Sequence, residues 1–193
     1  KGPEYCGQIF EEDIGFPEIS EMELGGINWT KFSEKKCNEI LKKPELDNHK
    51  YASGKVLIIA GSKGMTGAAI LSTNAALRSG AGLTLTPNPS SLNHIYETSI
   101  IEGLTFPIPD EGKGYLHISH YDSIMEKVEW ADSVLIGPGL GRSKSTQLLI
   151  KKLVKFIAKP LILDADGLFP YIDSLNKLSS KKTPLIITPH FGE

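Results

Sequence analysis

Short, uninterrupted apolar runs alternate with amphipathic segments from residue 55 onward. The runs are "KVLIIA" from Lys55, "SVLI" from Ser133, "PLIL" from Pro160 and "PLIIT" from Pro184. Continuous runs of this length, rich in Val, Ile and Leu, are typical of strands buried on both faces of a parallel sheet. The pattern therefore predicts strands at these four places.

Two amphipathic segments between the runs predict helices. "GAAILSTNAALRSG" from Gly67 ends at Gly80, and glycine is favoured just after the last turn of a helix. "KSTQLLIKKLVKFIA" from Lys144 places Leu149 and Leu153 on an inward face and its lysines outward, with Phe156 or Ile157 as the next inward position. Strands that alternate with helices predict an α/β fold: a mostly parallel sheet, helices on both faces and right-handed crossovers.

Residues 1–47 lack this alternation. The stretch 4–23 is mostly acidic, and "TKFSEKKCNEILKKPEL" from Thr30 carries a helical pattern that Pro44 ends. We interpret residues 1–47 as a linker and the tail of an upstream domain, and residues 48–193 as the folded domain.

A distinctive turn follows each of the four apolar runs. The turns are Gly61-Ser62-Lys63-Gly64, Gly137-Pro138-Gly139-Leu140-Gly141, Asp164-Ala165-Asp166-Gly167 and Pro189-His190-Phe191-Gly192-Glu193. Parallel strands end at one edge of their sheet, and open α/β sheets bind ligands outside that edge. We therefore expect the four turns to form one ligand site.

The first turn offers its backbone to a ligand. Gly61, Gly64 and Gly67 have no Cβ, and the following helix would present unpaired N–H groups to an anionic or strongly polar group. The stretch matches neither the Walker A loop nor the dinucleotide fingerprint. A purely structural corner, with Thr66 as the N-cap of the helix, is an equally open interpretation.

The other three turns supply further candidates. Gly137 and Gly139 could form a flat floor under a sugar or nucleotide, and we expect Gly139→Val to abolish ligand binding with little change in the fold. Asp164 would contact the ligand or buttress the site, whereas Asp166 would cap the next turn. His190 could donate to or accept from a polar ligand.

Composition excludes several classes of function. A formal net charge of -2, with 40% hydrophobic and 23% charged residues, favours neither a nucleic-acid partner nor an anionic membrane. No apolar stretch approaches the roughly 20 residues of a membrane span. Cys6 and Cys37 form no disulfide framework, and no His or Cys spacing indicates a metal site. We expect a cytoplasmic protein.

The motifs together resemble the ADP/ATP-dependent NAD(P)H-hydrate dehydratases, a branch of the ribokinase-like fold. The resemblance covers residues 48–193 and rests on five ordered stretches: "HK" from His49, "GKVLIIAGSKGMTGAAILSTNAALRSGAGL" from Gly54, "GPGLGR" from Gly137, "LDADGL" from Leu163 and "TPHFGE" from Thr188. A shorter stretch, "CGQIFEEDIGFP" from Cys6, resembles the end of an NAD(P)HX epimerase domain that is often fused ahead of this enzyme.

The resemblance implies repair of damaged nicotinamide cofactor. Hydrated NADH or NADPH (NADHX or NADPHX) would be phosphorylated on its new hydroxyl by ADP or ATP with Mg²⁺, and loss of phosphate would restore the double bond. It further implies that Ala68, Gly139 and His190 contact the hydrated cofactor. The turns themselves add Gly67, Gly137 and Asp164 as binding candidates. We also expect a homo-oligomer.

The sequence departs from the family in one respect. The family's adenine-nucleotide segment and its segment with the catalytic Asp follow "TPHxGE", and neither occurs here. We therefore expect the catalytic Asp to lie beyond Glu193, the 193-residue piece to lack the C-terminal part of the fold and, on its own, to be inactive. A fragment, an incomplete chain or a truncated gene product would each explain this.

Two other functions remain open. The first is a small-molecule kinase of the same fold that phosphorylates a vitamin or sugar hydroxyl. The second is a non-catalytic nucleotide-binding module. A kinase would release a stable phosphorylated product, whereas the dehydratase would regenerate the absorbance of reduced nicotinamide.

Overall fold

The computed structural model describes residues 33–40 and 49–190. The chain divides into two units, Lys1–Lys43 and Pro44–Glu193. In the first unit the described element is α1, Glu34–Ile40, which lies within the helical pattern predicted from Thr30. The epimerase-like stretch from Cys6 lies outside the described residues.

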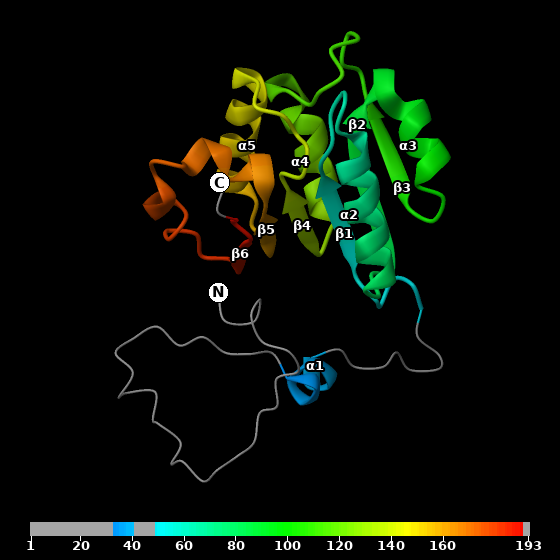
Figure 1. The fold of residues 1–193 in the computed structure, drawn as a ribbon, viewed down its shortest axis with the longest axis vertical. Coiled ribbons are helices and arrows are strands. Elements are labelled where there is room, and N and C mark those ends of the chain that lie inside the picture. The colour runs from blue at the N-terminus through cyan, green and yellow to red at the C-terminus, as the bar shows by residue number, and fades with distance from the viewer. Residues whose placement is uncertain (1–32, 41–48, 191–193) are drawn as a thin grey trace, which may run out of the picture. The chain divides into compact units, whose positions relative to one another are not determined.

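The second unit is built on a sheet of six parallel strands in the order β3-β2-β1-β4-β5-β6 (Figure 1). The strands are β1 Lys55–Ile59, β2 Leu83–Pro89, β3 Leu104–Ile108, β4 Ser133–Ile136, β5 Leu161–Leu163 and β6 Leu185–Ile187. The four predicted strands are confirmed. The α/β fold class with a parallel sheet is confirmed as well.

The apolar pattern did not predict β2 and β3. Pro87 and Pro89 in β2 and Pro107 in β3 interrupt what would otherwise be strand sequences. Proline is tolerated best on edge strands because it cannot donate to the ladder. β3 is an edge strand of the described sheet, and Pro87 lies beyond the part of β2 that pairs with β1, so each proline occupies a tolerated position.

Helices cover both faces of the sheet, as expected (Figure 1). The helices of this unit are α2 Thr66–Arg78, α3 Asn93–Ser99, α4 Tyr121–Trp130 and α5 Lys144–Phe156. Short 3₁₀ segments connect them: η2 Ser90–Leu92, η3 Ile118–His120, η4 Ala165–Gly167, η5 Phe169–Tyr171 and η6 Leu175–Lys177.

Alternate residues of the central strands feed two separate cores. Ile58 packs with Ala69 of α2 and Tyr96 of α3 on one face. Leu57 and Ile59 face the other core, which α4 and α5 cover. The first face is less covered over β5 and β6, where Ile162 and Ile186 are 38% and 59% exposed.

The C-terminal ends of α2 and α5 can be compared with what the sequence predicted. At the end of α2, Gly80 has φ +102° and its N–H donates to Leu77 O, while the Ala81 N–H donates to Ala76 O. This pair of bonds is a Schellman motif, which explains the glycine. In α5, Ile157 rather than Phe156 continues the buried face, since Phe156 is 53% exposed.

Candidate ligand-binding edge of the sheet

The strand register brings the four predicted turns to one edge. Ile59 at the end of β1 pairs with Ile136 of β4, Ile136 with Leu163 of β5, and Leu163 with Ile187 of β6. We call this side of the sheet the carboxyl edge. The strand order changes direction between β1 and β4, the switch point where open α/β sheets bind ligands.

The turns after β1 and β4 are hydrogen-bonded to each other. The Gly61 N–H donates to Pro138 O at 2.8 Å, and Ser62 Oγ donates to Gly139 O at 2.8 Å. The Gly137 N–H donates to Ile59 O at 3.1 Å, which extends the β1–β4 ladder into the turn. The two glycine-rich turns therefore form one connected backbone surface at the switch point.

Gly139 lies directly against the first turn of α2. It has φ +63°, and a Cβ added there would lie 2.9 Å from Ala68 Cβ and 2.9 Å from Met65 O. The structure thus brings together two residues that the resemblance placed at the site. It contradicts the expectation that Gly139→Val would leave the fold nearly unchanged, because the larger side chain would displace the start of α2.

Gly137 is packed against the turn after β5. Its φ is +133°, and an added Cβ would collide with the Asp164 carbonyl oxygen and come within 2.8 Å of Gly167 N. Glycine is therefore required here for close packing between two turns. Contact between Gly137 and a ligand stays a prediction.

Gly64 and Gly67 face open space. No atom lies within 4 Å of a Cβ added at either position. A ligand could therefore approach the backbone at the start of α2 more closely at these two glycines than at Gly137 or Gly139.

The start of α2 has no side-chain cap. Its N-cap residue is Met65, and Thr66 is the first helical residue, so Thr66 is not the cap that the structural interpretation of this turn named. The first N–H groups of a helix have no partners within it, and they attract anions and strong acceptors. Gly67 is the second residue of α2, so the open space at Gly67 lies beside these N–H groups.

Asp164 and Asp166 both support the edge, in different ways. Asp164 Oδ1 accepts a hydrogen bond from Thr188 Oγ1 at 2.7 Å, which joins the turns after β5 and β6. This geometry fits the buttressing role expected for Asp164.

The sequence suggested that Asp166 caps its own turn, but the structure contradicts this. Asp166 accepts hydrogen bonds from Gly141 N at 2.9 Å and from Arg142 Nε at 2.8 Å. The Arg142 guanidinium also lies over the Phe169 ring, 4.6 Å from its centroid. Asp166 therefore holds the end of the glycine turn after β4, a role that only a contact across 25 positions reveals.

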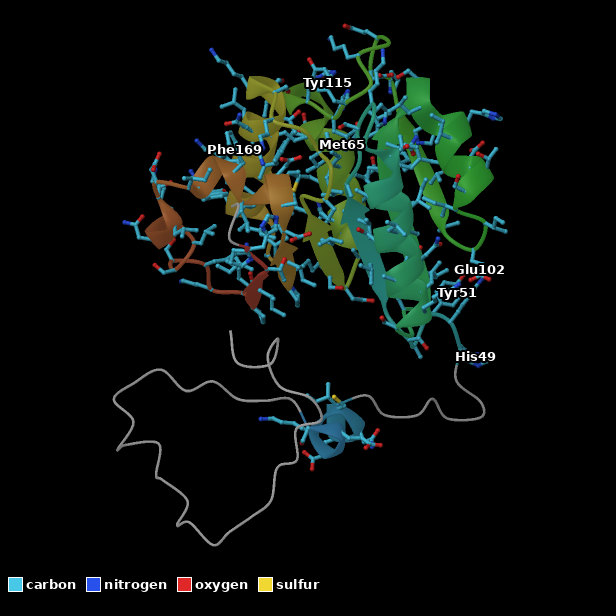
Figure 2. The ribbon with its side chains drawn as sticks, in the orientation of Figure 1. His49, Tyr51, Met65, Glu102, Tyr115 and Phe169 are labelled. Carbon is cyan, nitrogen blue, oxygen red and sulfur yellow. The ribbon has the colours of Figure 1, made fainter. Side chains whose placement is uncertain are left out.

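His190 follows β6 at the carboxyl edge and is exposed. Three strand spacings separate β6 from β1, which is roughly 14 Å. The predicted residues thus span the edge from Ala68 to His190. Figure 2 shows Met65, Tyr115 and Phe169 toward the same end of this unit, and Tyr51 and Glu102 toward the other.

The loop after β3 also joins the edge, although the apolar pattern did not predict a strand before it. Its Gly114 carbonyl accepts a hydrogen bond from Lys63 N at 2.7 Å, and so holds the turn after β1. The signal was present as "PDEGKG", a Gly-rich turn after a short apolar run, but Pro107 and Pro109 masked the strand before it.

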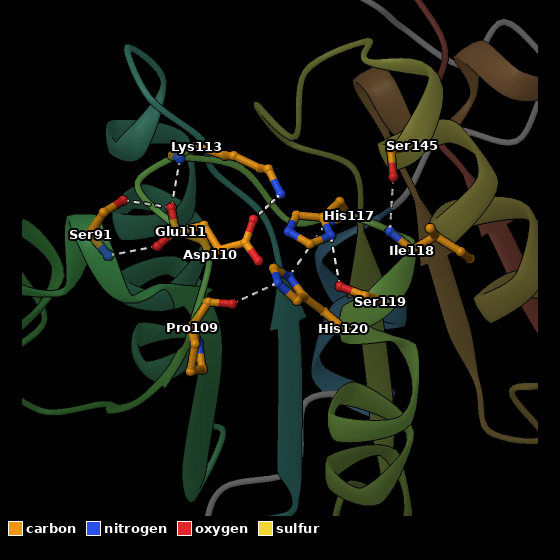
Figure 3. A network of polar contacts seen from close by, with 11 residues as sticks. Ser91, Pro109, Asp110, Glu111, Lys113, His117, Ile118, Ser119, His120 and Ser145 are labelled. Atoms are coloured by element: carbon orange, nitrogen blue, oxygen red, sulfur yellow. Dashed lines mark hydrogen bonds and ion pairs between the residues drawn. The ribbon is translucent and has the colours of Figure 1, made fainter.

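Asp110 anchors this loop (Figure 3). The carboxylate is 1% exposed and accepts hydrogen bonds from Ser91 Oγ and Gly114 N, both at 2.6 Å, and from Ser91 N and Ser90 Oγ. Burial alone would raise the pKa of Asp110, but these four donors outweigh it and hold the pKa well below its usual range. The ionised carboxylate thereby joins the loops after β2 and β3.

His117 and His120 close the other end of the loop. His120 Nδ1 accepts from His117 N at 3.3 Å, and His120 Nε2 lies 3.1 Å from the Pro109 carbonyl oxygen (Figure 3). These contacts require neutral His120 with its proton on Nε2. Burial lowers the pKa of both histidines, and for His120 the neighbouring His117 lowers it further.

Comparison with known proteins identifies the family. Residues 56–193 match the family model described as NAD(P)H-hydrate dehydratase. The bifunctional NAD(P)H-hydrate repair enzymes of Moorella thermoacetica and Escherichia coli are 32% and 33% identical to the whole chain. The chain covers 36% and 34% of those two proteins, or about a third of their length.

Solved structures show the same fold. A ribokinase-like superfamily protein from Enterococcus faecalis is 26% identical, with a TM-score of 0.64 over 79% of this chain and 52% of that chain. The ADP/ATP-dependent NAD(P)H-hydrate dehydratase of Bacillus subtilis, co-crystallized with ATP/Mg²⁺, is 24% identical, with a TM-score of 0.60 over 83% of this chain and 52% of that chain. The ribokinase-like fold is thereby confirmed, and this chain spans about half of it.

Proposed function

The chain belongs to the NAD(P)H-hydrate dehydratase family, and we propose that its carboxyl edge binds the hydrated nicotinamide cofactor, NADHX or NADPHX, for conversion to NADH or NADPH. The observation that carries this proposal is the junction of the turns after β1 and β4. There Gly139 packs on Ala68 beside the uncapped start of α2, and Gly67 faces open space. These are the positions at which the family resemblance places the cofactor.

The proposed reaction is loss of water at the expense of ADP or ATP. Hydroxide is a poor leaving group, so ADP or ATP would first phosphorylate the substrate hydroxyl. The C–O bond would then break, the oxygen would leave as part of phosphate, and loss of a proton from the ring would restore the double bond. The described residues would bind and orient the substrate. The N–H groups of Thr66 and Gly67 would donate to its oxygens, since the Ala68 N–H already donates to Met65 O. His190 would donate or accept at the other end of the edge.

The described residues contain no all-protein cage for Mg²⁺. Within residues 33–40 and 49–190 no three His, Cys, Asp or Glu side chains are grouped so as to hold a metal ion. The two carboxylates on the turn after β5 accept hydrogen bonds from Thr188, Gly141 and Arg142 instead. We therefore assign no step through the metal to these residues.

None of the helices among the described residues is long and apolar enough to cross a bilayer. Two further expectations accompany the proposed function. The cytoplasmic location and the homo-oligomeric state stay predictions.

Calorimetry with NADHX, and with NADH as the ligand that lacks the added hydroxyl, tests the proposal. Gly67→Leu should weaken NADHX binding more than tenfold by filling the open space beside α2. Ala75→Leu, an exposed position later in the same helix, should leave binding unchanged. Equal NADHX affinity in both variants would remove this edge from the substrate site.

An activity assay on a longer protein, in which this chain is joined to the family's two phosphoryl-transfer segments, separates the dehydratase from the kinase alternative. ADP- or ATP-dependent recovery of reduced-nicotinamide absorbance supports the dehydratase, and a stable phosphorylated product would contradict it. We expect this polypeptide to bind NADHX without turnover, because its sequence contains neither phosphoryl-transfer segment of the family.

A further inference from the structure

A cavity of about 640 Å³ lies away from the carboxyl edge. Its walls come from the last turn of α5 and from the segment between β5 and β6, down to Thr183 just before β6 begins. It therefore lies toward the amino ends of β5 and β6, and the proposed function does not use it. A volume in this range is typical of a site for a small organic ligand.

The inner wall of the cavity is apolar. Its buried residues are Val154, Ile157, Tyr171 and Leu178, each at most 7% exposed. Burial raises the pKa of Tyr171 to about 12, so its phenol stays neutral at any ordinary pH. Such a wall would accept an aromatic ring or a short hydrocarbon chain.

The charged residues that line the cavity all have one sign. Lys151, Lys155, Lys177, Lys181 and Lys182 belong to its lining, which contains no Asp or Glu. Clustered lysines without carboxylates produce a positive potential that attracts anions. An ammonium group is also a common partner for phosphate and similar oxyanions.

Lys181 is held in a fixed position. Its ammonium group donates to Ile157 O at 2.6 Å and to Val154 O at 3.0 Å, both at the end of α5. An ammonium group has three N–H donors, so one is left for a ligand oxygen. The charge is thus placed before a ligand arrives, which reduces the entropy lost on binding.

Thr183 supplies a second polar group. Its Oγ1 is buried and has no hydrogen-bond partner among the described residues. Buried hydroxyls without a partner are uncommon, and each calls for an explanation. Thr183 is part of the lining, so a rotation of its side chain would turn this hydroxyl toward a ligand oxygen in the cavity.

We propose that this cavity binds a small organic anion, in which a carboxylate, sulfonate or phosphate is attached to an aromatic or short aliphatic body. The body would pack on the wall formed by Ile157, Tyr171 and Leu178. The anionic group would take the third N–H of Lys181 and the hydroxyl of Thr183. The outer lysines would strengthen the attraction in a salt-dependent way.

Fluorescence titration of the 193-residue chain tests the proposal with two probes. The anionic dye is anilinonaphthalene sulfonate, and the neutral control is phenylnaphthylamine, which has a similar ring system without the charge. We expect the anionic dye to bind more tightly and its affinity to fall as salt is added. Equal affinity for both dyes, or no binding of the anionic dye, would overturn the proposal.

Matched variants locate the dye. Lys177→Glu, in the lining, should weaken binding of the anionic dye by about tenfold. Lys144→Glu, an exposed residue at the other end of α5 and outside the lining, makes the same charge change and should alter affinity less than about twofold. Equal effects of the two variants would place the dye elsewhere and contradict the proposal.

Lys181 gives a third readout. Lys181→Met should abolish binding of the anionic dye, whereas Lys181→Arg should retain it, because the arginine keeps the charge. Thermal melting monitored by circular dichroism shows whether the Met variant folds. If it does not fold, the result at Lys177 decides. A folded Lys181→Met variant that binds the dye normally would overturn the role given to Lys181.

Discussion

Gly139 and Ala68 pack so closely that a Cβ added to Gly139 would lie 2.9 Å from the Cβ of Ala68. One residue follows β4 and the other lies in the first turn of α2, so this contact joins two crossover units at the switch point of the sheet. The same contact makes Gly139 a structural residue as well as a candidate substrate contact. A substitution at Gly139 is therefore expected to lower the stability of the fold, whatever its effect on ligand binding.

Gly139→Ala should lower the free energy of unfolding by about 2–4 kcal/mol, because it combines a positive φ with overpacking against the Met65 carbonyl oxygen and Ala68. Gly64→Ala is the matched control, since Gly64 has φ +84° but no atom within 4 Å of an added Cβ. It should cost only the backbone strain, about 1–2 kcal/mol. Urea denaturation measures both, and equal losses would show that the Gly139–Ala68 contact adds nothing.

Gly67→Ala should raise the free energy of unfolding by about 0.5–1 kcal/mol. Alanine is the better helix former, and no neighbour obstructs its Cβ at this position. If the hydrated cofactor lies against Gly67, the same variant should bind it more weakly. Urea denaturation and calorimetry on one preparation check that the free energy of unfolding rises while the affinity for the hydrated cofactor falls. A variant that is more stable and binds normally would exclude close contact at Gly67.

Asp166→Ala should lower the free energy of unfolding by about 1–2 kcal/mol, because the Gly141 N–H loses its acceptor. Arg142→Ala should cost less than about 1 kcal/mol, since the Arg142 side chain is 56% exposed and its ion pair is screened by water. Hydrogen exchange at the Gly141 amide should accelerate in the first variant only. Acceleration in both would mean that the ion pair, not the single hydrogen bond, holds the turn.

Asp110 should make the domain sensitive to acid. Its pKa lies well below the usual value in the folded state, so the stabilisation is complete above the unfolded pKa of about 4 and is lost as pH falls below it. Asp110→Asn should lower the free energy of unfolding at neutral pH and flatten this part of its pH profile. Denaturation as a function of pH checks the slope, and an unchanged slope would show that other carboxylates dominate.

His120 should make the free energy of unfolding fall as the pH drops below about 6.5. Burial lowers its folded pKa, so neutral His120 stabilises the fold fully above the unfolded pKa of about 6.5, and the contribution falls as pH drops below that value. Protonation would direct an Nδ1–H at the His117 N–H, which now donates to that nitrogen. His120→Gln should flatten the profile between pH 6.5 and the folded pKa. An identical profile for wild type and variant would contradict this account.

The sequence by itself determined the parallel α/β architecture and the place of the candidate ligand edge. Continuous apolar runs predict strands because a strand buried on both faces must be apolar throughout. The turns after parallel strands lie at one edge of the sheet. The four runs became β1, β4, β5 and β6, and their ends are in register. The prolines of β2 and β3 concealed those strands, because local propensity does not show which strand lies at an edge.

Only the tertiary structure decided what each edge residue does. Gly137, Gly139, Gly64 and Gly67 look alike in sequence, yet the first two face neighbouring atoms and the last two face open space. Asp166 binds the turn after β4 rather than its own turn, and Gly114 holds the turn after β1. These roles depend on distances between segments far apart in the chain, which hydrophobic periodicity and turn chemistry do not encode.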